Sequence, residues 1–299
     1  MQMAPWNCAR FTHSVQGVLR LGWGGLTGLR RRVFDVSMGV FELQGHRAVV
    51  TGASAGIGAE VVRVLATGGC DVAFCARSSD AVHQLASELE SLPGRVFPLV
   101  ADMSDGAEVA RFCDDVEQQL GPPDILVNNV GASPSRNFLY MSDDDWEELF
   151  RLNLLSAVRC TRRFLPGMRA AKSGRVIMVS TAAAKYPGAA LVDYAASKAA
   201  MVATSTALAR KYGADGVLVN AVLPGRIRTP MWERTAAEIA GADGDTEAVF
   251  EGRSRDIPVG RFGTPVEVAN VVAFLASDLA SYINGASIDI DGGLGGFTF

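Results

Sequence analysis

Short apolar runs alternate along the chain with longer segments in which apolar residues recur every three to four positions. Val61, Val64 and Leu65 are one example of the longer spacing, which is typical of helices that bury one face. The short runs, which indicate buried strands, begin at Arg47 and continue in segments 71–77, 95–105, 124–131, 174–183, 217–225 and 286–293. Strands that alternate with helices indicate right-handed βαβ units and a parallel sheet. The pattern predicts an α/β fold with a doubly wound, parallel, seven-stranded sheet and helices on both faces.

Polar residues gather directly after these predicted strands. They lie at 51–58, 77, 102, 128–131, 180–181 and 224–229. Ligands of doubly wound sheets bind beyond the carboxyl ends of the strands, so we expect one site built from these segments.

The first predicted strand leads into a glycine-rich turn, TGASAGIG, and then into a helix. Gly52, Gly56 and Gly58 would let the backbone turn sharply, approach a pyrophosphate and pack the helix on the strand. The helix N-terminus would offer free N–H groups to the phosphates. This setting favours a Rossmann-type dinucleotide site, and the alternative is an ordinary helix-start loop rich in glycine and serine.

The end of the second predicted strand bears on the choice of cofactor. The run DVAFCAR ends in Arg77, and no acid follows until Asp80. An acid at this place holds the ribose 2′-hydroxyl of NAD, whereas an arginine accommodates the 2′-phosphate of NADP. We therefore expect NADP(H), with NAD(H) as the alternative if Arg77 is only a solvated loop residue.

Residues 1–37 differ from the rest of the chain. They hold five arginines and no acid before Asp35. This composition resembles a mitochondrial transit peptide, but translation could also begin at Met38, directly before the first strand. The scarcity of lysine beside arginine favours the second interpretation. We expect 1–37 to lie outside the fold, 38–299 to form the catalytic domain, and the protein to be cytoplasmic, or mitochondrial if the extension is a transit peptide.

The overall composition excludes several classes of protein. The 299 residues carry a net charge of −4 with no basic patch, which argues against a nucleic-acid partner. No run of about 18 apolar residues predicts a membrane span. The five cysteines form no CxxC pair, and only three histidines exist, so we expect no metal, no disulfide framework and no histidine-dependent hydrolase.

The segment DYAASKAA places Tyr194 and Lys198 four positions apart. Residues with this spacing share a helix face, so both polar groups can reach one site. By itself the pair could also be two solvated side chains on a helix.

Taken together, these motifs make the chain similar to the short-chain dehydrogenase/reductase family over residues 41–293, and to its 3-oxoacyl-acyl-carrier-protein reductase-like members. The family's TGxxxGxG motif stands at 51–58, and its NNAG motif appears as NNVG at 128–131. Asn153 lies in RLNLLS, Tyr194 and Lys198 form the YxxxK motif, and Pro224-Gly225 is followed by Thr229. The resemblance favours catalysis by the tyrosine–lysine pair.

The resemblance implies the catalytic residues Asn153, Thr181, Tyr194 and Lys198. It also implies a cofactor site, whose expected members are Gly52, Ser54, Gly56, Ile57, Gly58, Arg77, Asp102, Met103, Asn129, Tyr194, Lys198, Pro224, Gly225, Ile227 and Thr229. Thr181 stands thirteen residues before the tyrosine, where the family has a serine, and Ser180 is the alternative hydroxyl. Ala55 departs from the basic residue of many NADP-dependent members, so the expectation of NADP rests on Arg77.

The expected chemistry is hydride transfer between the nicotinamide and a carbonyl or secondary alcohol. Reduction leaves an alkoxide that needs a proton, and a tyrosine with a pKa of about 10 exchanges one poorly near neutrality. We expect the Lys198 ammonium to lower the pKa of Tyr194. By resemblance, Lys198 also binds the nicotinamide ribose, Thr181 or Ser180 orients the substrate oxygen, and Asn153 holds a water for proton relay.

Substrate and assembly are less determined by the sequence. Segment 227–258 predicts a mobile helical lid, with a surface insertion as the alternative. Four apolar or aromatic residues are expected to line the pocket: Tyr186, Leu191, Met231 and Trp232. The small residues of 194–213 fit either a subunit interface or an internal helix, and by resemblance we expect a homotetramer or a homodimer. A ketone or 3-oxoacyl substrate fits the site, and the alternative function is a catalytically silent dinucleotide-binding redox sensor.

Overall fold

A single seven-stranded parallel sheet forms the centre of the computed structural model, which describes residues 41–241 and 244–296. Its strand order is β3-β2-β1-β4-β5-β6-β7. The strands are β1 (Arg47–Thr51), β2 (Asp71–Ala76), β3 (Val96–Val100), β4 (Ile125–Asn128), β5 (Gly174–Val179), β6 (Val217–Pro224) and β7 (Ser287–Ile290). The predicted seven-stranded, doubly wound sheet is confirmed.

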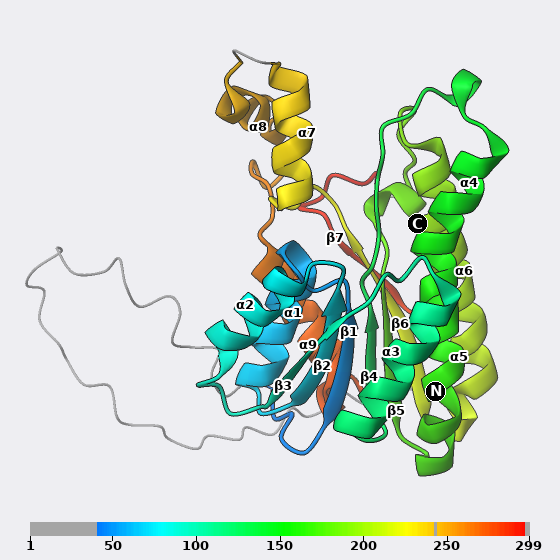
Figure 1. The fold of residues 1–299 in the computed structure, drawn as a ribbon. Coiled ribbons are helices and arrows are strands. Elements are labelled where there is room, and N and C mark those ends of the chain that lie inside the picture. The colour runs from blue at the N-terminus through cyan, green and yellow to red at the C-terminus, as the bar shows by residue number, and fades with distance from the viewer. Residues whose placement is uncertain (1–40, 242–243, 297–299) are drawn as a thin grey trace, which may run out of the picture. The chain divides into compact units, whose positions relative to one another are not determined.

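Helices cover both faces of the sheet (Figure 1). One layer contains α1 (Gly56–Thr67), α2 (Ser79–Leu89) and α9 (Pro265–Ala276), and the other contains α3 (Gly106–Gln119), α5 (Ser156–Ala171) and α6 (Val192–Tyr212). Neighbouring residues of a strand enter opposite layers: Val50 packs with the first and Val49 with the second. Because both faces of the central strands are buried, β1, β2, β4 and β6 are largely apolar runs, whereas the edge strands β3 and β7 are only partly buried and β7 alternates polar and apolar residues.

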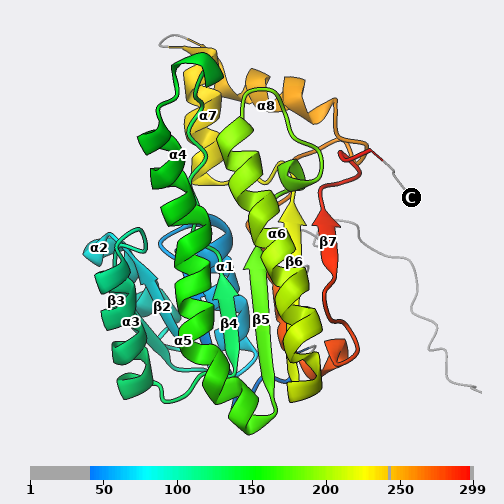
Figure 2. The same ribbon diagram turned by 90° about the vertical axis from the view of Figure 1, so that its right-hand side faces the viewer.

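The strand order reverses between β1 and β4. The chain moves outward from β1 to β3 on one side, then returns to β4 and moves outward to β7 on the other. Figure 2 shows the arrows of β4 to β7 pointing toward the end where α7 and α8 lie. The polar segments after β1 and β4 therefore meet at the switch point, where doubly wound sheets bind their ligands.

The remaining elements surround this carboxyl edge. They are η1 (Phe138–Tyr140), α4 (Asp143–Phe150), the π-helical turn η2 (Arg151–Leu155), η3 (Ala182–Ala184), α7 (Pro230–Ala240) and α8 (Thr246–Ser254), with η4 (Gly213–Asp215) and η5 (Asp278–Ala280) at the opposite ends of β6 and β7. Segment 227–258 is thus largely helical, as predicted. Ala236 of α7 and Phe250 of α8 form a small apolar cluster with Ile257 and Phe262, so the two helices pack against each other and against the segment that follows them.

Two boundaries differ from the sequence pattern. The segment 95–105, expected as the third strand and its polar exit, is followed directly by α3 at Gly106, because the Asp105 side chain accepts hydrogen bonds from the N–H groups of Ala107 and Glu108 and caps the helix. The third strand ends at Val100, before the polar turn at Asp102.

The predictions about residues 1–37, including Cys8 and His13, lie outside the described residues. In the part of the chain that the structure describes, no helix is long and apolar enough to cross a membrane.

Candidate active site

The glycine-rich turn between β1 and α1 is packed tightly against the segment that follows β4. Asn129 Nδ2 donates to the carbonyls of Thr51 at 3.0 Å and Gly52 at 2.8 Å. A Cβ atom at Gly58 would clash with the Gly52 carbonyl and lie 2.5 Å from Asn129 Nδ2. Gly52 itself has a φ of +71°. The predicted glycines are therefore required by close approach and by backbone conformation.

The N-terminus of α1 offers unoccupied N–H groups to the same turn. Its N-cap residue, Ala55, provides no capping side chain, whereas Ser78, Asp105 and Thr229 cap α2, α3 and α7. Ser54 and Ile57, both expected at the cofactor site, flank this terminus. Uncapped N–H groups and the helix dipole favour an anion such as a phosphate.

Arg77 and Asp102 lie at the carboxyl ends of β2 and β3. Arg77 is exposed and makes no hydrogen bond or ion pair with any other described residue. Asp102 accepts hydrogen bonds from the backbone N–H and the hydroxyl of Ser104, at 2.9 and 2.8 Å, which lower its pKa; the charge of Arg77 lowers that pKa further. Met103 beside it is buried. An unpaired guanidinium thus lies at the place where a 2′-phosphate was expected.

Lys198 is buried in α6, with 3% of its surface exposed. Its Nζ donates to the carbonyls of Val179 at 3.0 Å and Val130 at 3.3 Å, which close β5 and follow β4. Burial lowers the pKa of Lys198 to about 8, because the charged form loses hydration. The ammonium is therefore held at the switch point by backbone oxygens.

Tyr194 lies one helical turn before Lys198 on α6. Burial raises the pKa of Tyr194, and a hydrogen bond with Thr181 lowers it by a smaller amount. Burial of the phenol dominates its pKa in the structure, and the Lys198 ammonium is directed to two carbonyls, so the expected lowering of this pKa by Lys198 stays a prediction. The phenol accordingly remains protonated at neutral pH.

Ser180 and Thr181 have different surroundings. The Ser180 hydroxyl donates to the Lys198 carbonyl at 2.9 Å, and only 5% of the residue is exposed. Thr181 is half-buried, and its hydroxyl lowers the pKa of the Tyr194 phenol. The same hydroxyl donates to the Pro224 carbonyl at 3.4 Å. The structure brings Thr181 together with the tyrosine and directs Ser180 to the helix backbone.

Asn153 lies fully buried in the π-helical turn η2, a feature frequent at functional sites. Its Oδ1 accepts from the N–H of Ala132 at 2.9 Å, and its Nδ2 donates to the Ala132 carbonyl and to the Ser197 hydroxyl, both at 3.0 Å. Ser197 in turn donates to the Tyr194 carbonyl at 2.8 Å. Ser197 was missed from the sequence, where it is one of several small residues in YAASKAA.

The expected residues after β6 lie beside the glycine turn. The N–H of Gly225 donates to the Ile290 carbonyl at 3.0 Å, which fixes the end of Pro224 against β7. Ile227 is buried, and Thr229 begins α7 with its methyl group 3.4 Å from a Cβ placed on Gly56. This segment therefore closes the site from the side of α7.

The helices α7 and α8 are tied together at their bases. Arg228 forms ion pairs with Glu233 at 2.8 Å and with Glu247, and it lies 4.3 Å from the centre of the Phe250 ring. Trp232 packs edge-on against Phe262 with ring centroids 5.0 Å apart, so it belongs to the cluster within this segment. The other expected wall residues, Tyr186, Leu191 and Met231, are half-buried.

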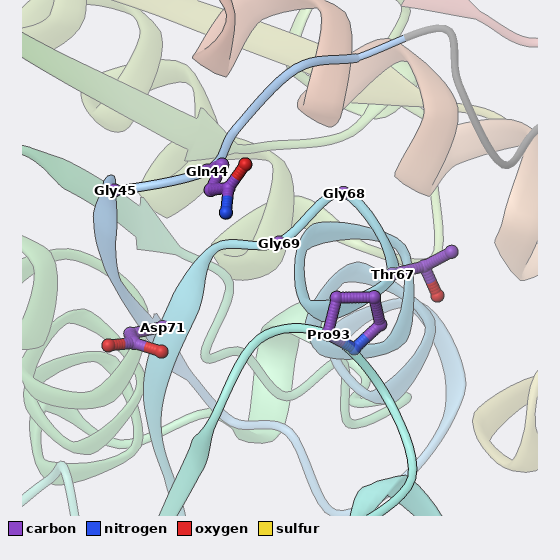
Figure 3. A pocket seen from close by; sticks show the side chains of 7 residues that line it. All are labelled: Gln44, Gly45, Thr67, Gly68, Gly69, Asp71 and Pro93. Atoms are coloured by element: carbon purple, nitrogen blue, oxygen red, sulfur yellow. The ribbon is translucent and has the colours of Figure 1, made fainter.

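A separate shallow pocket lies at the opposite, amino edge of the sheet (Figure 3). Its lining residues are Gln44, Gly45, Thr67, Gly68, Gly69, Asp71 and Pro93. The carboxylate in it, Asp71, is already paired with Arg95 at 2.5 Å. This pocket holds none of the expected catalytic groups.

Within residues 41–241 and 244–296, no cluster of three or more His, Cys, Asp or Glu side chains could hold a metal.

Comparison with known proteins places this geometry in a family. The model of a family described as enoyl-(acyl carrier protein) reductase matches residues 52–295. The 3-oxoacyl-[acyl-carrier-protein] reductase FabG of Thermotoga maritima is 35% identical over 252 residues, 84% of this chain and 98% of that protein.

Two solved structures are similar over nearly the same length. The L-sorbose reductase of Gluconobacter frateurii, complexed with NADPH and L-sorbose, has a TM-score of 0.83 and 32% identity, and the match covers 88% of this chain and 100% of that one. A Burkholderia xenovorans protein described as a short-chain dehydrogenase/reductase has a TM-score of 0.80 and 32% identity, with coverage of 87% and 100%. The chain belongs to the short-chain dehydrogenase/reductase family of oxidoreductases.

Proposed function

We propose that this protein interconverts a ketone or 3-oxoacyl group and the corresponding secondary alcohol with NADP(H), and that Tyr194 is its proton donor. The observation that carries the proposal is the position of Tyr194 on α6, one helical turn before the buried Lys198, with the Thr181 hydroxyl at the end of β5 lowering the pKa of the phenol. These three residues would handle the proton beyond the carboxyl ends of β4 and β5.

The residues around the glycine turn fit a dinucleotide. The uncapped N–H groups of α1 would hold the pyrophosphate. The absence of a side chain at Gly58 lets the glycine turn pack closely against the start of this helix. Arg77 would bind the adenosine 2′-phosphate, because it is exposed and unpaired among the described residues. When bound, the nicotinamide supplies or accepts the hydride, while the protein provides position and electrostatics.

The chain's own residues would handle the oxygen of the substrate. Thr181 hydrogen-bonds the carbonyl oxygen and fixes its position beside the Tyr194 phenol. The phenol, kept protonated by burial, gives its proton to the developing alkoxide, and Lys198 with a pKa of about 8 stabilises the phenolate that remains. Asn153 holds the backbone around Ala132 and could carry a relay water through the second lone pair of its Oδ1.

The choice of cofactor is tested at Arg77. Loss of a charge-assisted hydrogen bond costs about 1.5–3 kcal/mol, so Arg77→Ala should weaken NADPH binding by roughly one to two orders of magnitude and leave NADH binding nearly unchanged. Ala76→Asp with Arg77→Ala should prefer NADH. Arg210→Ala, which removes an exposed arginine in the last turn of α6, is the matched control. An unchanged NADPH:NADH ratio of kcat/KM in the Arg77 variants would contradict the NADP assignment.

The reaction itself is tested by following NADPH at 340 nm with a 3-oxoacyl thioester, L-sorbose and simple ketones. The first two substrates are suggested by the names of the similar proteins. Turnover of at least one carbonyl supports the proposal. Binding of NADPH without turnover of any of them would favour the silent redox sensor.

We further propose that the protein is a cytoplasmic homotetramer or homodimer. All four cysteines of the described part are buried free thiols, which is typical of a reducing compartment. The assembly is inferred from the family, and light scattering of the purified protein would test it.

A further inference from the structure

Asp193, the residue before Tyr194, is a buried carboxylate in the first turn of α6. Only 1% of the residue is exposed. Its Oδ1 accepts from the N–H of Tyr194 at 2.8 Å, while Oδ2 has no hydrogen bond to any described residue. The cation that faces Oδ2 is Arg136, with Nη1 at 3.6 Å. A buried carboxylate is costly unless a charge compensates it, so Asp193 depends on the charge of Arg136.

Arg136 connects three parts of the chain. It lies in the loop between β4 and α4, and its side chain is 24% exposed. Nη1 donates to the Asp145 carbonyl at 3.0 Å, and Nη2 donates to Glu148 Oε2 at 3.3 Å. The guanidinium therefore fixes loop 131–142 to α4 on one side and to the start of α6 on the other, where α4 packs on α6.

The same loop reaches Tyr194 by a second route. Ala132 is held by Asn153, whose amide also donates to Ser197, and Ser197 donates to the Tyr194 carbonyl. The N–H and the C=O of Tyr194 are thus both engaged by side chains that are themselves tied to loop 131–142. One tie runs through Asp193 and the other through Ser197.

We propose that the Arg136–Asp193 ion pair positions Tyr194 for proton transfer, by locking the first turn of α6 to the loop that follows β4. Arg136 and Asp193 are positioning residues, and the proposal rests on the proposed function of Tyr194 as proton donor. Misplacement of a reacting group by about 1 Å can cost about 100-fold in rate, so a loosened first turn should lower kcat more than it weakens cofactor binding.

The test uses the full chain and five variants. They are Asp193→Asn, Arg136→Met, Arg136→Lys, the double variant Arg136→Met with Asp193→Asn, and Arg151→Met as the control for an exposed arginine paired on the surface of the neighbouring turn. Each is measured for kcat and KM with one ketone, for the Kd of NADPH by fluorescence, and for the melting temperature.

Asp193→Asn and Arg136→Met should each lower kcat about tenfold or more, with the Kd of NADPH within about threefold of wild type. The double variant should be no slower than the slower single variant, because both singles break one interaction. Arg136→Lys keeps the charge and should recover part of kcat, while Arg151→Met should match wild type. Single variants that fold and keep kcat within about twofold, or losses that multiply in the double variant, would overturn the proposal.

A spectroscopic measurement keeps the test independent of turnover. The chain has five tyrosines, so protein labelled with 3-fluorotyrosine gives five ¹⁹F resonances, and Tyr194→Phe identifies the one from residue 194. This resonance should shift or broaden in Arg136→Lys and Arg136→Met, but not in Arg151→Met. An unchanged resonance in the folded Arg136 variants contradicts the proposal. If wild type turns over no carbonyl while the resonance responds as expected, the proposed function fails and the positioning contact stands.

Discussion

Replacement of Thr181 by valine removes one hydroxyl at nearly constant shape. The hydroxyl meets the Tyr194 phenol and is the group expected to hydrogen-bond the substrate oxygen. Ser180→Ala is the matched variant one position earlier, because it removes a hydroxyl that donates to the Lys198 carbonyl. The two variants separate a hydroxyl at the reacting centre from one inside the fold.

The magnitudes expected for the two variants are well apart. Loss of one hydrogen-bond donor at a developing oxyanion costs about 2.7–4 kcal/mol, or about 10²–10³ in kcat. Thr181→Val should fall in this range. Ser180→Ala loses one buried hydrogen bond of about 1 kcal/mol, which lowers the unfolding free energy, and kcat should change by less than about tenfold.

Steady-state kcat with saturating NADPH and one ketone measures this difference, with the melting temperature as a check on folding. Thr181→Ser keeps the hydroxyl and should retain kcat within about tenfold of wild type. A folded Ser180→Ala that is slower than a folded Thr181→Val would refute the role given to Thr181 and transfer it to Ser180.

Three further predictions concern the frame around the site. Gly58→Ala should abolish NADPH binding, because the added methyl group meets the backbone of the glycine turn, whereas Gly252→Ala, which has open space around it, should bind normally; tight binding by Gly58→Ala would contradict the packing. The pKa of His46 is raised by its hydrogen bond with Asp124, so the stability lost in His46→Gln should be largest below about pH 6.5 and should vanish as pH rises through the raised pKa. The melting temperatures of wild type and His46→Gln are compared at about pH 6 and about pH 9. A loss of melting temperature that is larger at about pH 9 would contradict this prediction. Deletion of residues 1–37 should leave folding and the Kd of NADPH unchanged, and loss of folded protein would show that the extension belongs to the fold.

The sheet could be predicted because its central strands are apolar runs, and the polar segments stood out because they follow these runs directly. Boundaries were harder where one side chain decides them, as at Asp105, whose capping bonds start α3 before the apolar period begins. The sequence did not decide whether Thr181 or Ser180 faces Tyr194. Neighbouring residues at the end of a strand face opposite sides, and the local pattern does not show which of the two faces the site.

The supports of Tyr194 could not be predicted from spacing. Arg136 and Asp193 are separated along the chain by α4, η2, α5 and β5, and nothing in either segment marks a partner for the other. The direction of the Lys198 ammonium was also hidden, since the spacing of four places it near Tyr194 but the carbonyls of Val130 and Val179 determine where it points. Such contacts depend on tertiary packing and not on local periodicity.

The most direct measurement compares wild type with Tyr194→Phe under saturating NADPH and a carbonyl that wild type reduces. The variant lacks only the phenolic hydroxyl, so NADPH should bind with an unchanged Kd. Oxidation of NADPH at 340 nm should fall by about 10²–10⁴-fold, the usual contribution of a general acid. A Tyr194→Phe protein that binds NADPH and retains kcat within about tenfold of wild type would contradict proton donation by Tyr194.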